Sequence, residues 1–229
     1  MNATTGELEI DSRPPDELAG AGCWDFAHEA WRVRFVGRGA PERAEGLFPA
    51  RARAWLQQVH GDRVVEARPG ACGAGDALLV GGIGVVACVA TADCVPVAIV
   101  AGRSGVLVHA GWRGIAAGVV ERALDALGDR RGVSAWIGPA IGPCCYEVGE
   151  EVARAVVSAT GESALRAETP GGRPRLDLRR AVAAQLRRGG VRRPTLVDHC
   201  TRCRAEWLWS YRRERERAGR NWSLLWREE

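Results

Sequence analysis

Lysine is missing from this chain, and its absence limits what the basic charge can mean. All 32 basic residues are arginine, against 28 acidic residues, which leaves a formal net charge of +4. Alanine and glycine are abundant as well, so we attribute the arginine bias to a GC-rich genome rather than to a nucleic-acid surface. The arginine-rich segment SYRRERERAGR (residues 210–220) has interleaved glutamates, which is typical of a solvated helix face. We therefore expect no nucleic-acid partner.

Long apolar runs and export signals are also missing. No apolar run reaches the length that spans a membrane. The first residues, MNATTGELEIDSRPPDEL, lack the basic flank and the apolar core of a signal peptide. Eight cysteines without such a signal favour reduced thiols over a disulfide framework. These features predict a cytoplasmic protein with no membrane association.

Short apolar runs alternate with helical patterns along most of the chain. Three valine-rich runs of strand length follow one another in the central segment, at residues 85–89, 95–100 and 106–108. A helical pattern then runs from about Gly114 to Gly128, and Asp177 is placed to cap a later helix. This alternation without a break in composition predicts one α/β (α+β) domain over residues 21–229. Residues 1–20, which are closed by two prolines, are expected to form a mobile leader.

Three residues of the metal-ligating type stand at the ends of these runs: His60, Cys94 and His109. Two imidazoles and one thiolate are good zinc ligands, and they leave a fourth tetrahedral position for water or substrate. The three are far apart in sequence, so their spacing alone is a weak signal. From spacing alone, a buried structural thiol with two ordinary histidines is the better interpretation.

The motifs around these residues change that balance. His60 stands in QQVHGDRV, Cys94 in TADCVPV and His109 in VLVHAGWRG, and IGPAIGPCCYEVGEEV, LDLRRAVAAQL and SYRRE with AGRNWS follow. Together they resemble the bacterial laccase-domain, or polyphenol oxidase, family from about Trp55 to the C-terminus. Members of that family are regarded as zinc-dependent purine nucleoside phosphorylases with adenosine deaminase activity. The family's metal ligands correspond to His60, Cys94 and His109.

The resemblance implies a fold, a cofactor and substrates. The implied fold is a single domain of mixed β-sheets layered between helices (α/β/β/α). The implied activity is phosphorolysis of adenosine- or inosine-type nucleosides with Zn²⁺, with adenosine deaminase and methylthioadenosine phosphorylase activities beside it. Purine nucleoside and phosphate are then the partners. The sequence predicts neither the preferred nucleoside nor an oligomeric state.

Arg113, Asp93 and Arg38 are the further candidates near the motifs. Arg113 follows His109 by four positions and directly precedes the expected helix, so guanidinium and helix N–H groups suit a phosphate. An ordinary surface ion pair explains Arg113 equally well. Asp93 adjoins Cys94 and is expected to orient a ligand, act as a base or cap the next element, with a positioning role favoured. Arg38 corresponds to an arginine of a family segment that is otherwise absent here, which leaves the substrate range open.

Three rival functions remain. The first is a copper-dependent, laccase-like polyphenol oxidase. Four histidines are too few for a multicopper cluster plus a blue-copper site, and the only methionine is Met1. Copper is nevertheless expected to bind the ligands in vitro. The second is a hydrolase with Cys94 as nucleophile and His109 as base. The third is a catalytically degenerate binding protein.

The cysteines Cys144, Cys145, Cys200 and Cys203 invite a second metal site. We expect none, because adjacent cysteines rarely face one ion and the C-x-x-C segment has no well-spaced partner pair in the sequence. The PCCYE segment also lacks the elements of a cytidine-deaminase-type zinc site. The role of the four cysteines stays open at the level of sequence.

Overall fold

The valine-rich runs of the central segment form buried strands, as the sequence predicts. They are β9 (Val85–Thr91), β10 (Val95–Ala101) and β11 (Ser104–Ala110). Val97 and Ile99 of β10 pack in one core, whereas the alternating Ala98 and Val100 pack in a second core. A strand that is buried on both faces has no polar face, which explains the continuous apolar pattern.

Two mixed sheets of seven strands carry the fold in the computed structural model, which describes residues 8–18, 20–39, 51–161, 164–168 and 172–229. The first sheet has the order β1 (Glu9–Asp11), β15 (Thr195–Val197), β12 (Ser134–Ile137), β10, β11, β8 (Ala77–Val80), β6 (Val64–Glu66). The second has the order β2 (Asp16–Leu18), β3 (Ala21–His28), β4 (Trp31–Val36), β16 (Asn221–Arg227), β9, β5 (Ala52–Gln57), β7 (Gly70–Ala74). A separate ribbon pairs β13 (Leu165–Glu168) with β14 (Pro174–Leu176).

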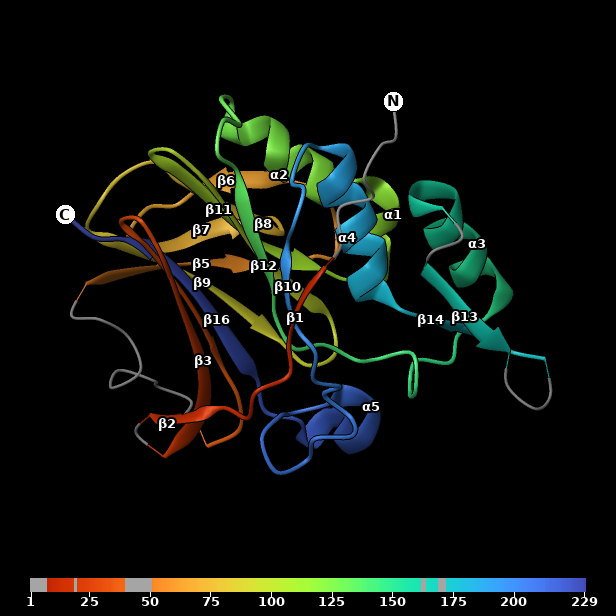
Figure 1. Cartoon of the computed structure of the whole chain (residues 1–229). Helices are drawn as coiled ribbons and strands as arrows, with labels where there is room; N and C mark the ends of the chain where they lie inside the picture. Colours follow the sequence, from red (N-terminus) through yellow and green to blue (C-terminus); the bar gives the residue numbers. More distant parts are fainter. Residues whose placement is uncertain (1–7, 19, 40–50, 162–163, 169–171) are drawn as a thin grey trace.

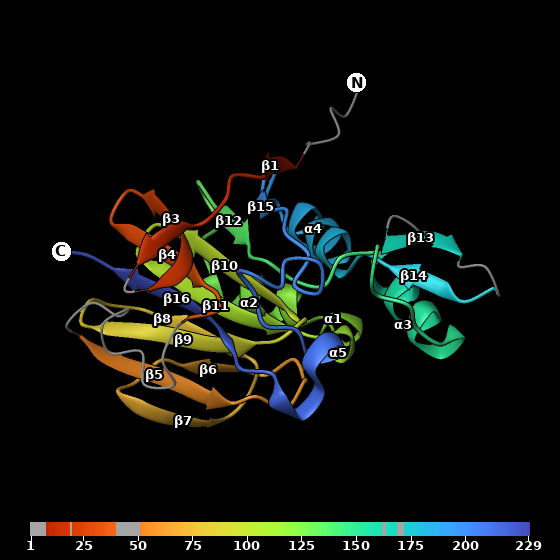
Figure 2. The same ribbon diagram turned by 90° about the horizontal axis from the view of Figure 1, so that it is seen from below.

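Helices cover one face of the first sheet, and the second sheet packs on its other face (Figures 1 and 2). These helices are α1 (Trp112–Ala117), α2 (Val119–Leu127) and α4 (Leu178–Arg188), with α3 (Glu150–Thr160) packed against α1 and α4. The short α5 (Tyr211–Glu214) lies apart from this layer and is followed by a 3₁₀ turn at Arg215–Arg217. One core lies between the helices and the first sheet, and a second lies between the two sheets. The predicted α/β domain with mixed sheets is thereby confirmed. None of the helices in the described ranges is long and apolar enough to cross a membrane.

Local signals explain where two of the helices begin and end. Asp177 caps α4, since its carboxylate accepts hydrogen bonds from the N–H groups of Arg179 and Arg180. The pattern expected as one helix after His109 is two helices, because Gly118 has a φ of 88° in the left-handed region and ends α1. The first of these begins at Trp112, two residues earlier than the sequence predicts.

The described part of the segment expected as a leader, residues 8–18 and 20, contains two strands that pair with the rest of the fold. β1 pairs in parallel with β15, and β2 pairs in antiparallel register with β3. In addition, the indole of Trp24 donates to the carbonyl of Arg13. An edge strand is held by backbone hydrogen bonds, so polar side chains and flanking prolines do not reveal it.

Candidate metal centre

His60, Cys94 and His109 come together at one end of the β10–β11 hairpin. Cys94 directly precedes β10, and His109 in β11 stands opposite Pro96. His60 lies in the loop that follows β5, on the neighbouring sheet. One possible ligand atom from each residue lies within 4.8 Å of the others. We call this group the His/Cys cluster; antiparallel pairing brings the start of β10 to the end of β11, which explains the convergence of Cys94 and His109.

Asp76 holds two parts of this cluster by hydrogen bonds, and the sequence did not predict this role. It is fully buried directly before β8, and its Oδ1 lies 2.8 Å from Nδ1 of His109. The same carboxylate accepts hydrogen bonds from the N–H groups of His60 (2.9 Å) and Gly61 (2.7 Å). These bonds hold His60 at a φ of 61°, which a non-glycine residue rarely adopts. With Nδ1 of His109 engaged, Nε2 is left for an ion.

The electrostatics of the cluster favour a thiolate. Burial opposes ionisation of Cys94, but hydrogen bonds from His109 and His60 and their positive charge lower its pKa to about 7. Burial likewise disfavours the charged form of His109, yet its bonds to Asp76 and Cys94 raise its pKa to about 9. The pKa of Asp76 is lowered despite its burial, because His109 and the backbone N–H groups of Gly61 and His60 stabilise the carboxylate. The thiolate is the form of cysteine that binds a metal, and His109 gives up the proton on Nε2 when an ion binds.

Two glycines of the HAGWRG segment leave room for this arrangement. A Cβ on Gly111 would lie 2.9 Å from the His60 ring and 3.2 Å from the sulfur of Cys94. A Cβ on Gly114 would lie 2.8 Å from the carbonyl oxygen of Gly61. Only glycine therefore allows the β11–α1 turn to pass so close to the His60 loop.

Arg113 is exposed at the start of α1, and its guanidinium stacks over the ring of Trp112 at 4.4 Å. Its charge acts on Tyr146, whose pKa is raised to about 12, mainly by burial and then by Cys94 and Asp93. Arg212 and Arg113 partly oppose that rise, and Arg212 lies over the Tyr146 ring at 5.1 Å. Two arginines and one buried phenol thus accompany the cluster, and sequence reasoning missed Tyr146 and Arg212.

Asp93 makes hydrogen bonds to the β15–α5 loop, to α5 and to the loop after β12. Its φ is 92°, and its carboxylate accepts hydrogen bonds from the hydroxyl of Thr201 (2.6 Å) and the N–H of Arg212 (2.7 Å). The N–H of Ile141 donates to its carbonyl oxygen at 3.0 Å. Among the three roles considered from the sequence, these contacts favour positioning, since they fix the backbone beside Cys94.

Arg38 lies at the end of β4, half-buried. Its guanidinium pairs with Glu214 and stacks on the ring of Trp209 at 3.6 Å. These contacts tie it to α5, the helix whose Arg212 N–H reaches Asp93. They do not bring it to the His/Cys cluster.

The four remaining candidate cysteines come together, against the sequence argument. Cys144, Cys145, Cys200 and Cys203 each offer a sulfur within 4.8 Å of the others, and we call them the four-cysteine cluster. The expectation that Cys200 and Cys203 lack a partner pair is therefore wrong, because the pair lies on a distant loop. The neighbouring His199 takes no part: its Nε2 contacts the carbonyl oxygen of Arg13 at 2.7 Å.

A surface cavity of about 470 Å³ lies away from both clusters. Its lining includes Glu9, His28 and Arg193 and none of the seven residues of the clusters. This cavity is open to solvent, and its lining carries charges of both signs. The clusters contain residues that can bind a metal, so we place the candidate site at the clusters and not at this cavity.

Known proteins share this sequence and fold. The chain matches the family described as Multi-copper polyphenol oxidoreductase laccase over residues 41–228. The chain belongs to this family. A purine nucleoside phosphorylase of Pseudomonas aeruginosa is 43% identical over 178 residues, which cover 75% of this chain and 73% of that protein. The purine nucleoside phosphorylase YfiH of Escherichia coli (strain K12) is 36% identical over 188 residues, which cover 80% and 76%.

Two solved structures have the same fold. A protein of Neisseria meningitidis, NMB0706, superimposes with a TM-score of 0.79 at 27% identity, over 95% of this chain and 99% of that chain. YlmD of Geobacillus stearothermophilus gives a TM-score of 0.73 at 31% identity, over 80% of this chain and 76% of that chain. The resemblance first seen in the motifs is confirmed.

The family description refers to copper, whereas the relatives' names refer to nucleoside phosphorolysis. The donor set of the His/Cys cluster can be compared with the ligands that each metal prefers. Two imidazoles and a thiolate with an open fourth position are typical of catalytic zinc. A blue-copper site adds a weak axial ligand, usually methionine, and the single methionine, Met1, lies outside the described residues. The residues present therefore fit zinc.

Proposed function

We propose that this chain is a zinc-dependent purine nucleoside phosphorylase acting on adenosine- and inosine-type nucleosides. One observation carries the proposal: a His₂Cys ligand set, held by a buried carboxylate, lies in a chain whose relatives are named purine nucleoside phosphorylases. The arginines near the cluster supply the positive charge that a phosphate co-substrate needs.

His60, Cys94 and His109 would hold the zinc ion. Bound there, zinc supplies a Lewis acid that polarises an electronegative atom of the substrate. Asp76 keeps the His109 ring and the His60 backbone in place, which limits the reorganisation needed when the ion binds. Asp93 holds the chain next to Cys94, and we assign it a positioning role.

Arg113 and Arg212 are the proposed phosphate contacts. In phosphorolysis an oxygen of phosphate forms a bond to C1′ of the nucleoside, and the bond from C1′ to the purine nitrogen breaks. The purine leaves with the electron pair of that bond and gains a proton. Guanidinium groups suit this role because they bind phosphate oxygens in pairs and stay charged throughout.

Tyr146 is suited to donate a hydrogen bond in this pocket. Burial and the neighbouring Cys94 and Asp93 raise its pKa to about 12, so the phenol stays protonated at neutral pH. It therefore acts as a donor toward an electronegative atom of the nucleoside and not as a base.

Further activities belong to the same proposal. Adenosine deamination and methylthioadenosine phosphorolysis would use the same ligands, because both substrates present a purine with an amino group. Arg38, which stacks on Trp209 shortly before α5, is the proposed contact for the more distant part of the substrate. Arg38→Ala is accordingly expected to raise KM more than it lowers kcat.

Product analysis tests the proposal. Zinc-loaded protein is incubated with inosine or adenosine, with and without phosphate, and free base, ribose 1-phosphate and inosine are quantified. Base release that requires phosphate supports the assignment, and Cys94→Ser serves as the inactive control. Equal base release without phosphate would identify a hydrolase instead.

Copper-dependent phenol oxidation is the second candidate, because the family description names it. It is tested with the same preparations: zinc-only protein should not oxidise phenols above background, and copper-loaded protein should do so weakly. Robust oxidation by the zinc-only form would reverse the order of the two candidates. A Cys94–His109 hydrolase, favoured by the pKa of Cys94 near 7, predicts ester cleavage by metal-free protein.

A further inference from the structure

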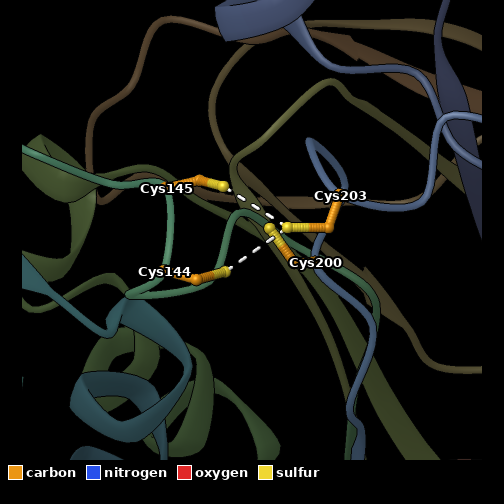
Figure 3. A group of neighbouring side chains, drawn as sticks. All are labelled: Cys144, Cys145, Cys200 and Cys203. Carbon is orange, nitrogen blue, oxygen red and sulfur yellow. Dashed lines mark hydrogen bonds between the residues drawn. The ribbon is translucent and has the colours of Figure 1, made fainter.

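The four-cysteine cluster is built from two loops that are distant in sequence. Cys144 and Cys145 lie in the loop between β12 and α3, and Cys200 and Cys203 lie in the loop between β15 and α5. All four side chains point toward a common centre (Figure 3). The proposed function uses none of them, so their convergence has no explanation in the chemistry described above.

The separations of the sulfurs suit one tetrahedral ion. The sulfur of Cys203 lies 3.6 Å from that of Cys144 and 3.4 Å from that of Cys145. Four zinc–sulfur bonds of about 2.3 Å at tetrahedral angles place the sulfurs roughly 3.8 Å apart. A disulfide needs about 2.05 Å, and all eight cysteines of the chain are free. The cluster is therefore spaced for coordination and not for a covalent bond between its members.

The backbone around Cys200 is arranged for a thiolate. The N–H of Gly142 donates to its sulfur at 3.2 Å, and the N–H groups of Arg202 and Cys203 also point at it. A Cβ on Gly142 would lie 3.3 Å from both the Cys144 sulfur and the Cys200 Cβ, so glycine admits the close approach of the two loops. Backbone N–H groups directed at sulfur stabilise negative charge there.

The adjacent cysteines reach one centre because they lie in a turn. The N–H groups of Cys145 and Tyr146 both donate to the carbonyl of Gly142, as in the first turn of a helix. Successive side chains diverge by about 100° in such a turn, and not by 180° as in a strand. The sequence argument against adjacent ligands assumed that they point apart, and the turn removes that objection.

We propose that Cys144, Cys145, Cys200 and Cys203 form a second metal site that binds one structural zinc ion. Its ligand set is closed, with four protein sulfurs and no position left for substrate, which is typical of structural zinc. Each thiol that becomes a ligand gives up its proton to water, and no electron is transferred. Iron–sulfur clusters also use four cysteines, but their sulfurs bind different iron atoms and so lie further apart than the ligands of one ion.

The loops that this ion would join also hold the residue before Cys94. Thr201, between the two cysteines of one loop, donates to the carboxylate of Asp93, and Ile141 of the other loop donates to its carbonyl. The backbone already links the loops, since the N–H of Thr201 donates to the carbonyl of Ala140 at 3.1 Å. A zinc ion would fix this junction, and the role proposed for it is stabilisation rather than chemistry.

Metal stoichiometry in four variants tests the second site separately from the first. Full-length protein, purified with reductant and without added metal, should carry about two zinc ions per chain if both sites bind. Cys94→Ser and Cys203→Ser should each retain about one, and the double variant should retain none. Cys72→Ser, which changes a cysteine outside both clusters, is the matched control and should retain two. If only the His/Cys cluster fails to bind zinc, wild type and Cys94→Ser should both carry one ion that Cys203→Ser lacks.

A second measurement covers the case in which Cys203→Ser does not fold. X-ray absorption of the Cys94→Ser protein should show zinc coordinated by sulfur alone. Alkylation followed by peptide mass spectrometry should find the four cysteines protected until a chelator is added. A disulfide within the cluster, iron with inorganic sulfide, or a metal-free Cys94→Ser protein would each overturn the proposal.

Discussion

The two cysteine-containing clusters of this molecule lie on either side of Asp93, yet they are built in opposite ways. Cys94 follows Asp93 directly, and the hydroxyl of Thr201, between Cys200 and Cys203, reaches its carboxylate. The His/Cys cluster combines an exposed His60 with a His109 that is only 3% exposed, so it is open to solvent on one side. The four-cysteine cluster uses sulfur alone from two turns. An incomplete ligand set beside solvent suits reaction, whereas a complete ligand set between loops suits stability.

The groups that hydrogen-bond to the ligands also differ between the two clusters. A buried carboxylate, Asp76, orients the imidazole of one cluster, while backbone N–H groups surround a sulfur of the other. Carboxylate support raises the basicity of a histidine ligand, which matters when a substrate must be polarised. Backbone N–H support only spreads the charge of a thiolate.

Removing a ligand of the His/Cys cluster should have the largest effect. Cys94→Ser or His109→Ala is expected to lower phosphorolysis more than about 100-fold, since loss of one of only three protein ligands exceeds the loss of a supporting group. Steady-state base release and zinc content measure the two consequences. Retention of full activity by a Cys94→Ser protein whose His/Cys cluster binds no zinc would separate this cluster from catalysis.

Removing the carboxylate support should have the next largest effect. Asp76→Asn keeps the size of the side chain but loses the charge that holds His109, so zinc affinity is expected to fall about 10- to 100-fold. Competition with a chromogenic chelator gives the affinity. Asp62→Asn, which changes a partly exposed aspartate on the loop that carries His60, is the control and should bind zinc as wild type does. An unaltered affinity in Asp76→Asn would show that the His109 ring is held by packing alone.

Arg113→Ala should separate phosphate binding from metal binding. Phosphorolysis is expected to fall at least ~10-fold, because a charged hydrogen bond is worth about 1.5–3 kcal/mol, while zinc content stays unchanged. Adenosine deamination consumes water and no phosphate, so it should change much less. Arg122→Ala, in the exposed part of α2, is the control. An equal loss of both activities would make Arg113 structural.

The smallest expected effect is a shift in the pH dependence of Cys94 alkylation. In metal-free protein its alkylation rate should rise with pH, with a midpoint near 7, because the two imidazoles offset the cost of burying the thiolate. Cys88, whose pKa burial raises to about 12, should stay unreactive over the same range. Peptide mass spectrometry resolves the two cysteines. A midpoint near that of a free thiol would mean that the imidazoles do not reach Cys94 in solution.

The local elements and the ligand candidates follow from the sequence. The runs at residues 85–89, 95–100 and 106–108 predict β9, β10 and β11 because apolar runs bounded by turns have few other solutions. Asp177 predicts the start of α4 because a carboxylate at that position satisfies free N–H groups. The motifs around His60, Cys94 and His109 also suffice to identify the family.

The groups that support and surround these elements depend on contacts between segments that are distant in sequence. The strands β1 and β2 depend on a free sheet edge, which no local pattern encodes. The role of Asp76 arises where it meets His109, 33 residues further along the chain. The four cysteines converge because the turn at Gly142 lies beside the turn at Cys200, 58 residues away. A sequence pattern records what neighbours along the chain do to one another, whereas ligand sets and supporting carboxylates depend on which loops the packed sheets bring together.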